Sequence, residues 1–197
     1  MNTKKQLWVL AGGNGAGKST FYRTRLAPKG MLFVNADVLA QQLYPHAPEL
    51  HSYDAAMLAG QIRAQLLQED RSFCFETVFS HPSKIDFVAQ AKTLGYEVIL
   101  VFIHLDSISL NQARVAQRVS EGGHGVPDEK IISRIPRVLK FIRQVLPLCD
   151  QVYILDNSRA DNPFQQLAVI HGGQVSLRQH LVSDWVRELL ADYLGEK

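Results

Sequence analysis

The chain of 197 residues has only two cysteines, a small net charge and no long apolar run. Cys74 and Cys149 lie in apolar stretches without metal-ligand spacing, which indicates buried free thiols in a reducing compartment. A net charge of +2 and a pI near 8.6 give no indication of a nucleic-acid partner. No apolar stretch approaches the ~20 residues that a membrane span needs.

Targeting signals, repeats and low-complexity segments are also lacking. Lys4 and Lys5 precede an apolar run, as in a signal peptide. That run is only about six residues long, which is too short for a signal peptide. A hydrophobic content of 46% and a charged content of 20% are typical of globular proteins. We therefore predict a cytoplasmic protein with one domain over residues 1–197 and with no membrane or nucleic-acid partner.

What the chain does have is a complete phosphate-binding motif, because residues 12–19 read GGNGAGKS and fit G-x-x-x-x-G-K-[ST]. Its glycines let backbone N–H groups point at a phosphate chain, Lys18 reaches the β- and γ-phosphates, and Ser19 ligates Mg²⁺. An apolar run at 6–11 precedes the motif and a helical pattern at 19–26 follows it, which is the expected context. The predicted ATP-binding residues are Gly12, Gly13, Asn14, Gly15, Ala16, Gly17, Lys18, Ser19 and Thr20.

Apolar runs of strand length alternate with helical patterns along the rest of the chain. The predicted strands are 6–11, 31–34, 72–79, 96–105 and 151–155. The predicted helices are 19–26, 38–43, 52–68, 82–95, 107–119, 128–146 and 183–194. Residues 167–170 and 174–177 flank His171-Gly172-Gly173 and predict a hairpin. The pattern predicts a three-layer α/β/α P-loop fold with a mainly parallel five-stranded sheet, plus a small C-terminal hairpin and helix.

Two carboxylates follow different predicted strands at the edge where ligands bind in such sheets. Asp37 could accept the proton of a substrate hydroxyl, as phosphoryl transfer requires, or it could cap the following helix. Glu76 interrupts the run FCFETVF, where a charge is costly unless it is paired. Its candidate partners are Mg²⁺, an arginine or substrate hydroxyls. The alternative is that the carboxylate is exposed to solvent at the end of the strand.

A third carboxylate, Asp106, ends the apolar run 98–105. A carboxylate in that place is similar to the Mg²⁺-associated second motif of P-loop proteins. A helix cap before Ser107 fits the pattern equally well.

Two arginine pairs flank a glycine-rich break at 122–125. Arg114 and Arg118 are four residues apart, and Arg134 and Arg137 are three apart, so each pair shares a helix face. Two such helices joined by a mobile loop predict a lid over residues 114–137 that stabilises charge on the transferring phosphoryl group. Solvated helix faces are the alternative. His124, between glycines, could contact phosphate, although a loop histidine is more often exposed.

Five segments together resemble the zeta-toxin-like P-loop kinases, in particular a small stand-alone bacterial branch. They are GGNGAGKST, NAD at 35–37, FETVFS at 75–80, GGHGVP at 122–127 and DNS at 156–158. The resemblance covers roughly residues 6–160 and rests on the FET and GGHxVP segments more than on the phosphate loop. The larger zeta toxins place an arginine shortly after the base, where this chain has Val38-Leu39-Ala40.

The resemblance implies roles for several residues. Zeta toxins phosphorylate a hydroxyl of UDP-N-acetylglucosamine, and an antitoxin protein blocks their nucleotide site. Lys18 and Ser19 would bind ATP·Mg²⁺, Asp37 would be the catalytic base, and Glu76 and Thr77 would contact substrate. The phosphate-binding lid arginines would be Arg118 and Arg134.

We therefore expect an ATP-dependent kinase that phosphorylates a hydroxyl of a small metabolite, with a nucleotide sugar as one candidate. We expect the acceptor to enter between Asp37, Glu76 and residues 44–51. The alternative is a nucleotide-dependent ATPase, switch or toxin component that a protein partner regulates and that has no small-molecule acceptor.

Overall fold

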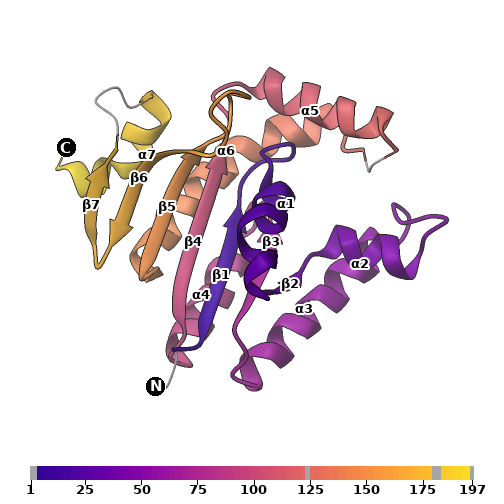
Figure 1. Cartoon of the computed structure of the whole chain (residues 1–197), viewed down its shortest axis with the longest axis horizontal. Helices are drawn as coiled ribbons and strands as arrows, with labels where there is room; N and C mark the ends of the chain where they lie inside the picture. Colours follow the sequence, from indigo (N-terminus) through magenta and orange to yellow (C-terminus); the bar gives the residue numbers. More distant parts are fainter. Residues whose placement is uncertain (1–3, 123–124, 179–182, 196–197) are drawn as a thin grey trace.

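The structure, a computed structural model, describes residues 4–122, 125–178 and 183–195. One seven-stranded sheet runs through its centre in the order β2-β3-β1-β4-β5-β6-β7 (Figure 1). The first five of these strands are parallel, and β6 and β7 continue the sheet antiparallel. The strands are β1 (Gln6–Ala11), β2 (Leu32–Val34), β3 (Phe73–Thr77), β4 (Glu97–His104), β5 (Gln151–Asp156), β6 (Gln165–His171) and β7 (Gln174–Leu177).

Helices connect the parallel strands, as parallel pairing requires. The α-helices are α1 (Lys18–Phe21), α2 (Ala36–Leu43), α3 (Ser52–Gln68), α4 (Ser83–Thr93), α5 (Ile108–Ser120), α6 (Asp128–Val145) and α7 (Asp184–Leu194). A π-helical stretch, Tyr22–Leu26, continues α1 and is followed by a 3-10 turn, Ala27–Lys29. A second 3-10 turn, Leu146–Leu148, follows α6. No helix in the described ranges is long and apolar enough to cross a membrane.

Two hydrophobic clusters form the core, one on each face of the sheet. Alternate residues along each strand divide between them, because successive side chains point to opposite faces. Leu7 and Val9 of β1 join the larger cluster, which α3, α4, α6 and α7 complete. Leu10 of β1 joins the smaller one, which is closed by Phe21, Tyr22 and Leu110. The layer around α1 is therefore the thinner of the two outer layers.

The phosphate loop follows the central strand, where the order of the sheet reverses. From β1 the chain crosses over β3 to build β2, whereas β4 and β5 are added on the other side. Such a switch point leaves a crevice at the carboxyl ends of the strands. Gly12 makes the turn into this crevice, with φ +150°. A Cβ there would lie 2.1 Å from the backbone oxygen of Ile103, so only glycine lets β1 and β4 approach this closely.

The predicted α/β class and P-loop architecture are confirmed, with one correction to the sheet. The hairpin predicted at 167–170 and 174–177 is not separate, because β6 pairs with β5 along Gln151–Asp156. Pairing with β6 satisfies the backbone groups that β5 would otherwise expose at the edge of the sheet. The helix predicted over 19–26 is also irregular, since α1 ends at Phe21 and a π-helical stretch follows.

The contact between Gly12 and β4 gives a direct test of this arrangement. Gly12→Ala should lower the free energy of unfolding by roughly 2–4 kcal/mol, because the new Cβ meets a backbone atom that cannot move aside. Gly30→Ala is the matched control, since Gly30 has φ +71° with open space around it and should cost only about 1–2 kcal/mol. Equal losses in chemical denaturation would contradict the close packing of β1 on β4.

Candidate active site

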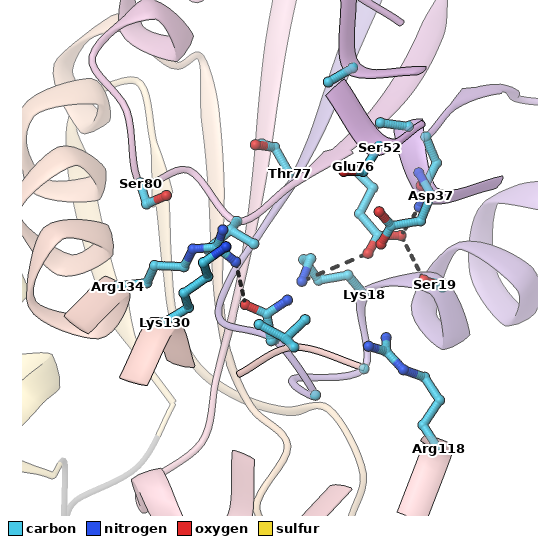
Figure 2. A pocket seen from close by; sticks show the side chains of 18 of the residues that line it. Lys18, Ser19, Asp37, Ser52, Glu76, Thr77, Ser80, Arg118, Lys130 and Arg134 are labelled. Carbon is cyan, nitrogen blue, oxygen red and sulfur yellow. Dashed lines mark hydrogen bonds and ion pairs between the residues drawn. The ribbon is translucent and has the colours of Figure 1, made fainter. Parts of the chain in front are cut away.

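A cleft of about 680 Å³ opens at the carboxyl edge of the sheet. The phosphate loop and α1 form its floor, α2, α3 and the segment after β3 form one wall, and α5 and α6 form the other. Figure 2 shows side chains from several of these elements, among them Glu76, Arg118 and Arg134, gathered around Lys18. Residues far apart in the sequence are thus brought to one place by the topology of the sheet.

Glu76, near the end of β3, is the most connected side chain in the cleft. Its Oε2 accepts a hydrogen bond from Ser19 Oγ at 2.7 Å and another from Asn35 Nδ2 at 2.8 Å. Its Oε1 lies 3.7 Å from Lys18 Nζ, and only 12% of its side chain is exposed. The carboxylate is therefore paired, as burial of a charge requires, and it ties α1 to the ends of β2 and β3.

Asn35 positions the second carboxylate, Asp37. It is the N-cap of α2, and its Oδ1 accepts hydrogen bonds from Asp37 N at 2.7 Å and Val38 N at 3.2 Å. Because Asn35 fills the capping role, Asp37 is not the cap that the sequence allowed as an alternative. Its side chain lines the cleft beside Glu76 and Ser19 (Figure 2).

Lys18 lies over the phosphate loop and donates a hydrogen bond to Gly13 O at 2.9 Å. Burial lowers the pKa of Lys18 below its usual value, while the charges of Glu76 and Asp37 act to raise it. Arg118 lowers the pKa further, so a cation from the opposite wall is also close. An anion bound in the loop would stabilise the charged ammonium in this dry position.

Two asparagine side chains hold the phosphate loop through its backbone carbonyl groups. Asn111 Nδ2 donates to Asn14 O at 2.6 Å, and Asn157 Nδ2 donates to Ala16 O at 2.9 Å. A Cβ at Gly17, where φ is +97°, would lie 2.4 Å from Asn157 Nδ2. These contacts explain why the loop needs glycine at Gly17 and how its shape is fixed without a ligand.

The opposite wall carries basic side chains from two helices. Arg134 Nη1 donates to Asn14 Oδ1 at 3.1 Å, and Figure 2 shows Lys130 beside it, with Arg118 on the far side of Lys18. Burial lowers the pKa of Arg134, as does the charge of Arg137, whereas Asp37 raises it. Positive groups thus surround the phosphate loop on both sides, which suits a polyphosphate.

A tight turn after β3 presents Thr77 to the cleft. Its Oγ1 accepts a hydrogen bond from Phe79 N at 3.1 Å. Phe79 is fully buried and has φ +63°, an unfavourable value for a side chain of this size. The buried ring fixes the turn and lets Glu76, Thr77 and Ser80 line the cleft.

The structure brings together most of the residues that the sequence singled out. Lys18, Ser19, Asp37, Glu76, Thr77, Arg118 and Arg134 all line this cleft, as do Asn14, Gly15, Gly17 and Thr20 of the predicted ATP-binding loop. Gly12, Gly13 and Ala16 belong to the same loop without lining the cleft. The roles of all these residues in binding and catalysis stay predictions.

Other candidates lie elsewhere. Asp106 accepts a hydrogen bond from Trp185 Nε1 at 2.8 Å and does not line the cleft, and Ser107 is the N-cap of α5. Arg137 is exposed and donates to Ser133 O, so it does not share the cleft with Arg134. His124 lies outside the described residues.

The acceptor entrance also differs from the expectation. Ser52, Tyr53 and Ala56 of α3 line the cleft in place of residues 44–51. Helices α2 and α3 pack directly against each other. The first turns of α3 therefore form this part of the wall.

Sequence reasoning missed several side chains of the cleft. Lys130 lies four residues before Arg134, so a helical-face count could have included it. Arg63, Lys84 and Asn111 carry no local signal, because tertiary packing alone brings them to the loop or the cleft. Asn157 lies in the DNS segment at 156–158, but that segment did not indicate its contact with the phosphate loop.

The donor set fits a magnesium ion bound together with a nucleotide. Ser19 and Glu76 offer a hydroxyl and a carboxylate at hydrogen-bond distance, and oxygen ligands are what Mg²⁺ prefers. Among the described residues, no three His, Cys, Asp or Glu side chains cluster as metal ligands. The remaining ligands would come from phosphate oxygens and water, which is usual for Mg²⁺.

Comparison with known proteins agrees with the geometry. A curated Haemophilus influenzae protein of uncharacterised function is 30% identical over 133 residues, which cover 64% of this chain and 94% of that protein. A chain of the AvrRxo1-ORF1:AvrRxo1-ORF2 complex is 19% identical with a TM-score of 0.73 over 90% of this chain. This chain spans 62% of the length of that one.

A further solved structure, of the PezAT toxin–antitoxin system of Streptococcus pneumoniae, is 16% identical with a TM-score of 0.64. The match covers 98% of this chain and 85% of the chain in that structure. At such identities the structural matches show a shared fold. The model of the zeta toxin family, however, matches residues 1–162, the part that contains the whole cleft. This chain therefore belongs to the zeta toxin family.

Proposed function

We propose that this protein is an ATP-dependent kinase that phosphorylates a hydroxyl group of a small metabolite. The observation that carries this proposal is the meeting of two carboxylates, Asp37 and Glu76, with Lys18 and Ser19 in one cleft. Membership of the zeta toxin family supports a nucleotide-dependent phosphotransferase. A match at 20% identity and TM-score 0.68 is to an AvrRxo1-ORF1:ORF2 structure with ATP.

In this proposal the triphosphate of ATP lies along the phosphate loop. Lys18 and the cations of the opposite wall, Arg118 and Arg134, neutralise charge on the transferring group. Ser19 and Glu76 would hold Mg²⁺, which when bound neutralises charge on the β- and γ-phosphates. We thus assign Glu76 to the metal side of the site, because its carboxylate lies against Ser19.

Asp37 is the proposed base for the acceptor. Its carboxylate takes the proton as the acceptor oxygen bonds to the γ-phosphorus, and ADP leaves with the electrons of the broken bond. Thr77 and the start of α3 lie on the same wall and would contact the acceptor. A nucleotide sugar is one candidate for the acceptor, since zeta toxins act on such a molecule.

A protein antitoxin that blocks the nucleotide site is a further proposal, supported by the likeness to PezAT.

The transfer step is tested with γ-labelled ATP and a metabolite extract. The parent protein should produce a labelled compound other than inorganic phosphate. Asp37→Asn should bind ATP within a few-fold of the parent but lose roughly 100-fold or more in transfer, the scale of a general base. Lys18→Ala should lose both binding and transfer, because it removes a direct phosphate contact. Label found only in inorganic phosphate, equally with Asp37→Asn, would favour the ATPase or switch.

The proposed lid over residues 114–137 makes a separate prediction. Arg134 and Lys130 lie on α6 and Arg118 on α5, so bound phosphates would draw the two helices toward the loop. Amide hydrogen exchange at 114–122 and 125–137 should slow when ATP·Mg²⁺ is added, while α7, at 184–194, serves as the internal control. Unchanged exchange at saturating nucleotide would contradict closure.

A further inference from the structure

We propose that Arg63 and Lys84 form a subsite that binds an anionic group, a phosphoryl or a carboxylate, on the acceptor. This inference rests on the proposed kinase function and narrows the acceptor to alcohols that carry such a group. The subsite is distinct from the cations around the phosphate loop, since Arg63 lies on α3 and Lys84 lies on α4.

Arg63 is held in place but lacks a charge partner. Its guanidinium lies over the rings of Phe75 and Phe87, at 5.2 and 5.4 Å from their centroids. Its Nε is buried and has no hydrogen-bond partner among the described residues. A buried N–H without an acceptor is costly, which leaves this guanidinium poor in acceptors. Arg63 lines the cleft, so a ligand oxygen would meet its outer Nη groups, because the Nε itself is covered by protein atoms.

Lys84 adds a second positive charge at the same place. Burial lowers the pKa of Lys84, and the charge of Arg63 lowers it further, so the two cations are close enough to repel. Burial also lowers the pKa of Arg63. Within the described part of the chain, no salt bridge or side-chain hydrogen bond joins either residue to a carboxylate. Two half-buried like charges without a counter-ion are unfavourable until an anion arrives.

The cleft reaches this pair along α3. Ser52, Ala56 and Arg63 all line it, and their spacing places them on one face of the helix. At 1.5 Å per residue, Ser52 and Arg63 are about 16 Å apart along the helix axis. The same cleft contains Asp37 and Glu76, so one acceptor can meet the proposed base while its anionic group contacts Arg63 and Lys84.

The side-chain chemistry suits a two-oxygen anion. Arginine offers parallel N–H donors that match the oxygens of a carboxylate or phosphoryl group, and lysine adds a point charge. Ser80, four residues before Lys84, also lines the cleft and offers a hydroxyl donor. Binding would give the outer N–H groups of Arg63 an acceptor and would offset the repulsion between the two cations.

Nuclear magnetic resonance of the arginine Nε–H groups tests the subsite without any turnover. The Arg63 signal is assigned by its loss in Arg63→Met, which keeps an apolar stem over Phe75 and Phe87. Inorganic phosphate and acetate are then titrated with a non-hydrolysable ATP analogue and Mg²⁺ present. One or both anions should shift the Arg63 signal saturably, and the one that binds identifies the anionic class.

Matched variants make the result specific. Lys84→Met should weaken the anion affinity seen at Arg63 by roughly tenfold or more, the scale of one lost charge-assisted contact. Lys29→Met removes an exposed lysine outside the cleft and should leave the affinity within about twofold. An Arg63 signal that neither anion moves, or equal effects of the two variants, would overturn the subsite.

An acceptor panel connects the subsite to the proposed function. Glycerol, glycerol 3-phosphate and glycerate share a three-carbon skeleton with two adjacent free hydroxyls, and the third carbon carries a hydroxyl, a phosphoryl group or a carboxylate oxygen pair. One of the charged compounds should be the better acceptor. Arg63→Met should then raise the acceptor KM and leave the KM for ATP unchanged. Equal use of glycerol would contradict the proposal. If the Arg63 signal shifts but no alcohol in any panel or extract is phosphorylated, the subsite stands and the kinase function fails.

Discussion

The geometry of this cleft depends on one buried carboxylate, that of Glu76. Three elements meet there, because Lys18 and Ser19 of α1 and Asn35, just after β2, all contact the carboxylate that β3 carries. Through Asn35 the same contact fixes the start of α2 and therefore the place of Asp37. An apolar side chain at Glu76 would leave Asn35 Nδ2 without its acceptor and Lys18 without its ion-pair partner.

Charge in the cleft is strongly unbalanced although the whole chain has a net charge of only +2. Eight lysines and arginines line the cleft against two acidic residues, so it is suited to anions. Cations near the phosphate loop would meet the nucleotide, and Arg63 and Lys84 would meet the acceptor. The low net charge of the sequence hid this local excess, since acidic side chains elsewhere on the surface offset it.

Sequence reasoning predicted the parts of this protein that local patterns encode. The phosphate loop, the alternation of strands and helices, and the placing of Asp37 and Glu76 at one sheet edge follow from motif and periodicity. The α/β P-loop class is confirmed. The pairing of β6 with β5 was missed, because a hairpin pattern does not say which strand lies beside it.

Residues that act through tertiary contacts could not be predicted in the same way. Asn111 and Asn157 reach the phosphate loop from positions 97 and 141 residues away from their partners. The DNS segment at 156–158 supports the family resemblance, but it does not indicate which part of the chain Asn157 contacts. In the sequence, Arg63 is one charged residue in a helix whose apolar residues show little periodicity. Only the tertiary fold places its guanidinium over the ring of Phe75. Asp106 is the opposite case, a residue with a local signal but no place in the cleft. Its position after a strand suggested a role at Mg²⁺, but its carboxylate accepts a hydrogen bond from Trp185.

We propose that Glu76 is the carboxylate that holds Mg²⁺, and calorimetry of ATP binding with and without Mg²⁺ can decide this. The parent protein should bind ATP more tightly when Mg²⁺ is present. Glu76→Gln should lose most of that gain, yet bind metal-free ATP at least as well as the parent, because a negative charge near the phosphates is gone. An equal gain from Mg²⁺ in both proteins would contradict the account.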